Sequence, residues 1–147
     1  PGAVGMAKAL ELVKKERKTD KFAKMKKMRD EFINQMKKSV DRVTVNGDLE
    51  KRTPNNIHLS FYGAEGESIL MMLDEQGISI STGSACASGS LEPSHVLTAI
   101  GLSPEYSHGS LRVTTGRSTT EQDLNKLAQV LPAIIKKLRG MSPLKSS

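Results

Sequence analysis

Residues 110–122, Ser-Leu-Arg-Val-Thr-Thr-Gly-Arg-Ser-Thr-Thr-Glu-Gln, take the chain from a strand directly into a helix and indicate its fold class. The first six of these residues form the expected strand. A capping box follows, formed either by Ser118 with Glu121 or by Thr119 with Gln122. In such a box, a hydroxyl at the helix start and a Glu or Gln three residues later satisfy each other's backbone donors. The stretch therefore predicts a strand that packs beside the helix it leads into.

The same mixture of short strands and helices extends back to about residue 41. We expect strands at 43–45, 57–61 and 78–81, and helices at 67–75, at 93–101 and from 118 to about 139. Gly77 and Gly101 end the first two helices, since glycine tolerates the left-handed conformation that closes a helix. This order predicts an α+β fold, a small mixed or antiparallel sheet covered by helices, over residues 41–140. Residues 141–147 are expected to be a frayed tail.

Residues 1–40 form a different region, in which apolar residues recur at helical spacing with no Pro after the first position. The polar stretch 16–21 divides two apolar stripes and is a plausible bend or break. A helix of about 50 Å is longer than a small domain needs, so part of it is expected to pack on something outside this chain. The region holds 12 basic and 5 acidic side chains. Its basic face is either solvated helix surface or a docking surface for an acidic partner or nucleic acid.

The composition of the 147 residues fits one domain and excludes several classes of protein. A single Cys cannot form an internal disulfide, and with three His no metal site is predicted. No apolar run approaches the roughly 20 residues of a membrane span, and no secretory leader is recognised. We therefore expect a cytoplasmic, reducing compartment and no membrane partner. The net charge is +6, but aromatics make up only 3% of the chain, which disfavours nucleic-acid binding by base stacking.

Residues 81–90, Ser-Thr-Gly-Ser-Ala-Cys-Ala-Ser-Gly-Ser, carry the only cysteine of the chain, Cys86. Structural cysteines usually pack among apolar neighbours, whereas Cys86 stands between two alanines in a polar segment punctuated by glycines. This setting suits a thiolate that must reach a reaction centre, and an inert thiol fits it about equally well. No His or Asp stands close enough in the sequence to suggest a cysteine protease.

Arg112 is the second candidate for chemistry. If Leu111 and Val113 face the core, Arg112 points to the other face of the sheet, because side chains alternate along a strand. Its guanidinium could hold a small carboxylate in a forked pair, or form a structural salt bridge with Asp or Glu. Arg117 is expected to be structural, at the turn before the last helix. The three histidines, His58, His95 and His108, are scattered and are expected to pack or hydrogen-bond.

Several of these motifs together resemble cysteine desulfurases of the NifS/IscS type. The segment Thr-Gly-Ser-Ala-Cys-Ala-Ser-Gly-Ser-Leu-Glu-Pro-Ser-His-Val-Leu at 82–97 closely resembles the active-site loop of that family. The similarity continues through 108–112 and 116–117, and extends back through 46–50, 54–55, 65–68 and 4–6. It covers nearly the whole chain, and the motif around the cysteine is long and specific.

The resemblance implies the small, C-terminal domain of a fold type I aminotransferase that uses pyridoxal phosphate. Such an enzyme converts L-cysteine to L-alanine and a persulfide. Cys86 matches the family's nucleophile, and Arg112 matches the Arg that holds the substrate carboxylate. The long loop marks the group that passes sulfur to an iron–sulfur scaffold protein. The long helix within residues 1–40 matches the joint to the large domain.

The same resemblance implies that the large domain lies outside this chain. In this family the large domain contains the Schiff-base Lys, the Asp that pairs with the pyridine nitrogen and most phosphate contacts. No cofactor-binding residue is therefore predicted in this chain. Smaller departures are Val-Thr-Thr at 113–115, where relatives commonly have Phe-Ser-Leu, and Ser118, where an aromatic is common. They are expected to alter the packing behind Arg112.

Three functional hypotheses follow from the sequence. The first is the C-terminal domain of a homodimeric cysteine desulfurase, inactive as an isolated chain. The second is a non-enzymatic sulfur carrier or interaction module that kept Cys86 and lost the cofactor half. The third is a nucleic-acid binder, supported only by the charge of residues 1–40, which would bind with a steep salt dependence.

Overall fold

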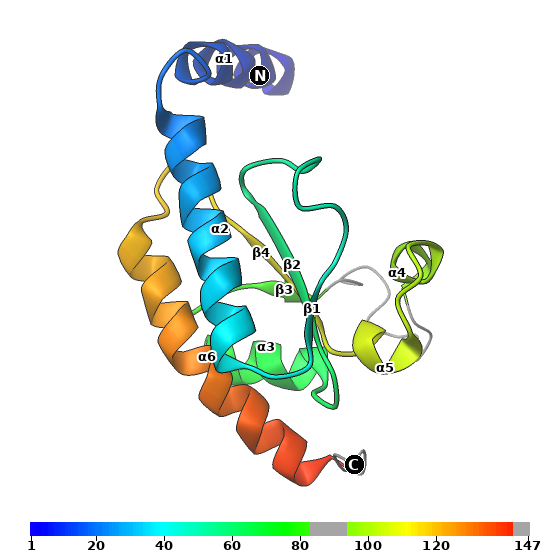
Figure 1. Cartoon of the computed structure of the whole chain (residues 1–147). Coiled ribbons are helices and arrows are strands. Elements are labelled where there is room, and N and C mark those ends of the chain that lie inside the picture. Colours follow the sequence, from blue (N-terminus) through cyan, green and yellow to red (C-terminus); the bar gives the residue numbers. More distant parts are fainter. Residues whose placement is uncertain (83–93, 143–147) are drawn as a thin grey trace.

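The computed structural model describes residues 1–82 and 94–142 and shows an α+β arrangement, as predicted (Figure 1). Four strands form one sheet: β1 (Val43–Val45), β2 (Asn56–Phe61), β3 (Ser81–Thr82) and β4 (Ser110–Thr114). The helices are α1 (Gly2–Glu16), α2 (Lys21–Ser39), α3 (Gly66–Asp74), α4 (His95–Ala99), α5 (Pro104–Ser107) and α6 (Glu121–Met141). In this part of the chain, none of the helices combines the length and hydropathy needed to cross a bilayer.

The sheet is antiparallel throughout, with strand order β1-β2-β4-β3. Its two central strands are β2 and β4, paired with Leu59 opposite Leu111 and His58 opposite Arg112. On the outer side of β4, Ser81 of β3 lies opposite Arg112. The register therefore lines up one residue from each of β2, β4 and β3 across the sheet.

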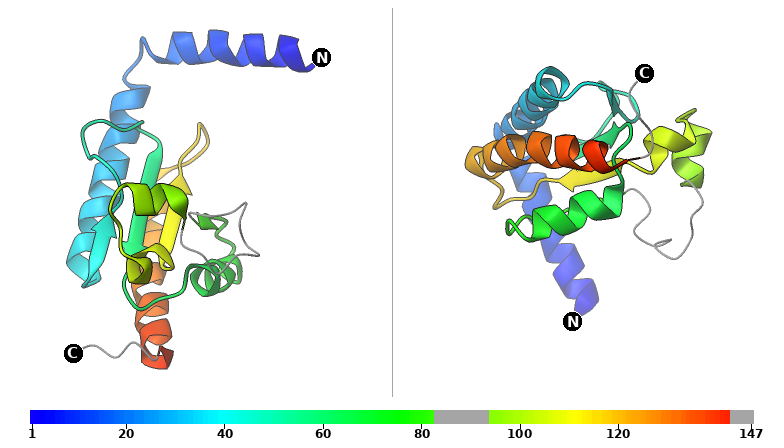
Figure 2. Two further views of the ribbon diagram at one scale, coloured as in Figure 1. Left: turned by 90° about the vertical axis from the view of Figure 1, so that its right-hand side faces the viewer. Right: turned by 90° about the horizontal axis from the view of Figure 1, so that it is seen from below.

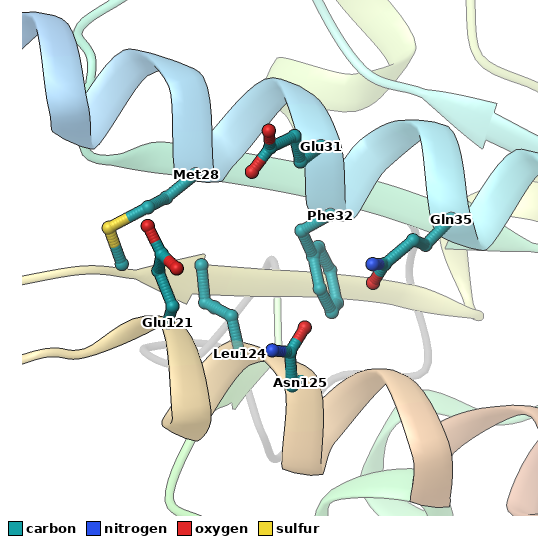
Figure 3. A pocket seen from close by; sticks show the side chains of 7 residues that line it. All are labelled: Met28, Glu31, Phe32, Gln35, Glu121, Leu124 and Asn125. Carbon is teal, nitrogen blue, oxygen red and sulfur yellow. The ribbon is translucent and has the colours of Figure 1, made fainter.

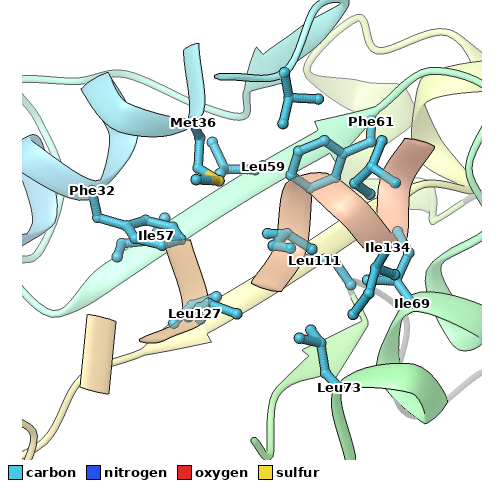
Figure 4. Packing of buried hydrophobic residues seen from close by; sticks show 14 of the residues in the cluster. Phe32, Met36, Ile57, Leu59, Phe61, Ile69, Leu73, Leu111, Leu127 and Ile134 are labelled. Carbon is cyan, nitrogen blue, oxygen red and sulfur yellow. The ribbon is translucent and has the colours of Figure 1, made fainter. Parts of the chain in front are cut away.

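The core lies between one face of this sheet and the helices α2, α3 and α6 (Figure 4). Phe32 and Met36 of α2 and Leu127 of α6 pack against alternate residues of the two central strands. The strand residues in this core are Ile57, Leu59, Phe61, Leu111 and Val113. Since strand side chains alternate between faces, burial of this set directs the intervening residues to the opposite face.

The expected break in the N-terminal region is present, because α1 ends at Glu16 and α2 begins at Lys21. Helix α1 projects from the top of α2 at a steep angle (Figure 2). None of its residues is buried, and Val4, Met6, Leu10 and Val13 are exposed. That part of the region packs on something outside the chain, as an interdomain helix, remains a prediction.

The start of α6 differs from the predicted alternatives. The capping box uses Thr120 and Asp123, not Ser118 with Glu121 or Thr119 with Gln122. The Thr119 hydroxyl instead accepts a hydrogen bond of 2.8 Å from the Gly116 N–H, which closes the preceding turn. The cap is therefore shifted to the next residue along the chain.

The end of α6 also differs, since the helix continues through Gly140 to Met141. Arg139 holds this last turn by donating from Nε to the Tyr62 carbonyl at 2.8 Å and by pairing with Asp41. These tertiary contacts outweigh the tendency of glycine to end a helix.

The short elements around β3 are smaller than expected. The strand predicted at 78–81 shares only Ser81 with β3 (Ser81–Thr82). The helix after Pro93 begins at His95 with Ser94 as its N-cap. Helix α5 was not predicted. Gly77 and Gly101 have φ of +70° and +83° and end their helices as predicted.

Gly109 is required by a close approach of two backbones that the sequence analysis missed. A Cβ at this position would lie 2.1 Å from the Phe61 carbonyl oxygen. No side chain fits there, so glycine allows β4 to begin directly against the end of β2.

Candidate functional site

The candidate site lies on the face of the sheet opposite the hydrophobic core. Arg112 of β4 is exposed, whereas its neighbours Leu111 and Val113 are buried, which confirms the predicted direction of its side chain. Its Nη2 donates a long hydrogen bond of 3.5 Å to the Ser81 hydroxyl of β3. Within residues 1–82 and 94–142, Arg112 forms no ion pair with a carboxylate. A structural salt bridge, the alternative considered for this residue, is therefore not seen in this part of the chain.

His58 is the neighbour of Arg112 on β2, and the Asn46 N–H donates to the His58 carbonyl at 2.9 Å. The four residues Asn46, His58, Arg112 and Ser81 thus form a row across the sheet. His58 is half-buried, and its Nε2 is enclosed without a hydrogen-bond partner in the described residues. Burial, followed by the positive charges of Arg112 and Arg52, lowers the pKa of His58 to about 4. The imidazole is therefore neutral at neutral pH.

Arg52 lies in the segment between β1 and β2 and adds a second guanidinium near this row. It donates to two backbone carbonyls, from Nε to Asp48 at 2.7 Å and from Nη2 to Asn46. Burial, followed by the charge of Arg29, lowers the pKa of Arg52. The Asp48 carboxylate accepts from the N–H groups of Glu50 and Lys51, and its charge and that of Asp30 act on Arg52. Within the row, Arg112 is therefore the guanidinium that has no carboxylate partner in the described residues, which suits it to an anionic ligand.

The other predicted residues are placed as follows. Cys86 lies outside the described residues. Arg117 pairs with Glu16 at 2.8 Å, in agreement with a structural role at the turn before α6. His95 and His108 are exposed on other elements. The proximity of His58 to Arg112 was missed, because alternation within residues 57–61 gives its face but not its cross-strand neighbour.

A small groove lies between α2 and α6, on the opposite side of the molecule (Figure 3). Met28 and Phe32 of α2 and Leu124 of α6 supply its apolar wall, and Glu31 and Glu121 add two like charges. Its volume of about 40 Å³ leaves room for little more than water. In the described residues, no three His, Cys, Asp or Glu side chains gather as a metal site would require.

Comparison with known proteins decides the family. A model described as "Aminotransferase class-V" matches residues 1–127. The chain belongs to the class-V aminotransferase family. Cysteine desulfurase IscS of Dictyoglomus turgidum is 49% identical over 98% of this chain. Cysteine desulfurase IscS 1 of Archaeoglobus fulgidus is 46% identical, also over 98% of this chain. A solved structure called "NIFS-LIKE PROTEIN" superposes on 93% of the chain with a TM-score of 0.76 and 25% identity.

This class-V aminotransferase chain spans about a third of the length of its relatives, 36% and 37% of the two desulfurases and 34% of the NifS-like structure. The family depends on pyridoxal phosphate. The strands β1, β2, β3 and β4 contain no lysine, so they offer no amine to that cofactor. Their exposed guanidinium, Arg112, is suited to binding a carboxylate.

Proposed function

We propose that this chain is the C-terminal, small domain of a cysteine desulfurase. The observation that carries the proposal is the exposed Arg112, which has no carboxylate partner in the described residues, in a chain almost half identical to IscS proteins. A guanidinium on a strand is a rigid, forked donor that can bind the carboxylate of L-cysteine through two parallel hydrogen bonds. Arg112 would orient the substrate, and Cys86 would accept its sulfur.

The reaction balances with these two residues and one substrate molecule. The Cys86 thiolate attacks the sulfur of L-cysteine, an S–S bond forms and the Cβ–S bond breaks. The electron pair of the broken bond stays on Cβ, which takes up a proton, so that the products are L-alanine and a persulfide on Cys86. Pyridoxal phosphate supplies the electron sink for such chemistry in this family. In our proposal it is held by a part of the enzyme outside this chain, and the 147 residues alone are inactive.

The proposal implies several partners. The exposed apolar residues of α1, such as Val4 and Leu10, would pack against the large domain, within a homodimeric enzyme. The persulfide would pass to an iron–sulfur scaffold protein. A cysteine that must cycle between thiolate and persulfide also needs a reducing compartment, and the cytoplasm meets this requirement.

The test uses the full-length protein encoded by the gene, incubated with L-cysteine and assayed for L-alanine and protein-bound persulfide. We expect Cys86→Ser to abolish both products while the absorption band of bound pyridoxal phosphate is unchanged. Arg112→Ala should raise the KM for L-cysteine about 10- to 100-fold, the equivalent of one desolvated charge-assisted contact. Arg112→Lys, which keeps the charge but loses the forked pair of donors, should raise the KM by less than Arg112→Ala does.

Two results would contradict the proposal. Undiminished persulfide formation by the Cys86→Ser enzyme would remove Cys86 as the nucleophile. A full-length protein that binds no pyridoxal phosphate and makes no alanine would instead favour the sulfur carrier without a cofactor. As a control, the 147-residue chain should show neither a cofactor band nor alanine formation when pyridoxal phosphate is added.

A further inference from the structure

We infer that His58 is a positioning residue for Arg112: as an uncharged neighbour on the same face, it leaves the guanidinium free to hold the carboxylate of an amino-acid substrate. The inference rests on the proposed function and adds a specific requirement to it. The residue beside Arg112 must be polar enough to lie at the edge of a charged site, yet carry no charge itself.

The first argument is the position of His58. It lies directly opposite Arg112 on the neighbouring strand, so the two side chains leave the sheet on the same face. Side chains opposite each other in an antiparallel pair are within interaction distance, and a charged residue at this point would act directly on the guanidinium. Ser81, the neighbour of Arg112 on the other side, is also uncharged. Arg112 is thus flanked by neutral residues on both adjacent strands.

The second argument is that the surroundings keep His58 neutral. The charged groups that act on it are Arg112 from β4 and Arg52 from the segment before β2, and both oppose protonation. Its Nε2 is enclosed without an acceptor in the described part of the chain, so an imidazolium there would bury an unsatisfied charged donor. Burial acts in the same direction and lowers the pKa to about 4.

The third argument is the effect of other charges at this point. A carboxylate at position 58 would form a cross-strand ion pair with Arg112 and compete with the substrate for the same donors. A permanent cation there would lie directly opposite Arg112 and repel its guanidinium. A neutral polar side chain has neither effect. Histidine meets this condition only because its surroundings prevent protonation.

The kinetic test compares His58→Asn with His58→Asp, two nearly isosteric variants that differ in charge. In the full-length enzyme we expect His58→Asn to keep the KM for L-cysteine within about threefold, and His58→Asp to raise it roughly tenfold or more. The kcat should change much less. Inhibition by cysteamine, which is L-cysteine without its carboxylate, should be the same for both variants, whereas a general distortion of the site would weaken both ligands.

Asn125→Asp is the matched control, because it adds the same charge at an exposed position of α6, on the core side of the sheet. It should leave the KM unchanged. Thermal denaturation shows whether both His58 variants are folded. If they are, equal KM values for His58→Asn and His58→Asp would overturn the inference. So would a loss of cysteamine binding equal to the loss of L-cysteine binding.

An independent test on the 147-residue chain follows the imidazole of His58 by NMR, with His95 and His108 as internal references. Replacing chloride by trifluoroacetate, a carboxylate that stays ionised where His58 titrates, should raise the pKa of His58 at constant ionic strength, because a carboxylate on Arg112 offsets its charge. The pKa should also rise in Arg112→Ala, where trifluoroacetate should have no further effect. A His58 signal that responds to neither change would overturn the inference. If trifluoroacetate raises the pKa but the full-length protein makes no alanine, the proposed desulfurase function fails and the inference about carboxylate binding stands.

Discussion

The two faces of the central strands β2 and β4 differ in what they bury and in what they leave unpaired. On one face, Ile57, Leu59 and Leu111 lie in the core with at most 2% of their surface exposed. On the other, His58 is half-buried and Arg112 is exposed. Adjacent residues of the same strand therefore serve different purposes. One set stabilises the sheet, and the other presents a guanidinium for binding.

The polar face is also less well satisfied. The enclosed atoms Nε2 of His58, Oδ1 of Asn46 and Nη1 of Arg52 have no hydrogen-bond partner in the described residues. Each unsatisfied buried polar atom costs about 1–3 kcal/mol. Departures of this kind concentrate at functional sites, where local stability is sacrificed for binding. Substitutions at adjacent positions of the same strand should therefore change stability and binding separately.

The largest expected difference between the two faces is that between alanine substitutions at two adjacent positions of β4. Leu111→Ala should lower the free energy of unfolding by about 2–5 kcal/mol, because it leaves a cavity in the core. Arg112→Ala, one residue further on, should change it by less than about 0.5 kcal/mol, as expected of an exposed side chain without a strong partner. Urea denaturation of the 147-residue chain measures both. Similar losses of unfolding free energy in the two variants would show that the polar face also contributes to the stability of the fold.

This contrast also explains how much could be predicted from the sequence. The α+β class, three of the four strands and the direction of Arg112 follow from local periodicity, which residues 110–115 display clearly. The cross-strand neighbour of Arg112 does not, because register depends on contacts between segments more than 50 residues apart. The cap at Thr120 was missed for a similar reason, since the hydroxyl of Thr119 is used by a turn that only the folded chain forms. Assignment of Cys86 and Arg112 to a reaction depended on resemblance to a family.

A smaller effect should appear in the pH dependence of stability. The pKa of His58 is about 4 in the folded chain and near 6.5 when unfolded, so the unfolded state binds more protons between these values. Stability is therefore full above pH 6.5 and falls as the pH is lowered towards 4. With allowance for solvent screening at this half-buried site, the loss between pH 7 and pH 5 should be about 1–2 kcal/mol.

His58→Gln provides the control, because it keeps a polar side chain but cannot titrate in this range. Unfolding of both proteins at pH 7 and pH 5 isolates the contribution of the imidazole. Arg112→Ala should reduce the loss without removing it, since burial is the larger cause of the low pKa. An identical pH dependence in the wild type and in His58→Gln would mean that the imidazole is not held neutral by its surroundings.

The smallest expected effect lies where the chain leaves the polar face at the end of β4. Arg117 donates from Nε to Glu16 at 2.8 Å, and Lys21 pairs with the same carboxylate oxygen at 3.1 Å, so this corner joins α1 and α2 to the loop before α6. Arg117 is 62% exposed, and such pairs contribute only about 0.2–1 kcal/mol. A double-mutant cycle of Glu16→Gln and Arg117→Ala should return a coupling energy in that range and lose most of it at high salt. A coupling energy of several kcal/mol would instead show that this ion pair contributes to stability as much as the core face does, and that it belongs to the folding unit that holds β4.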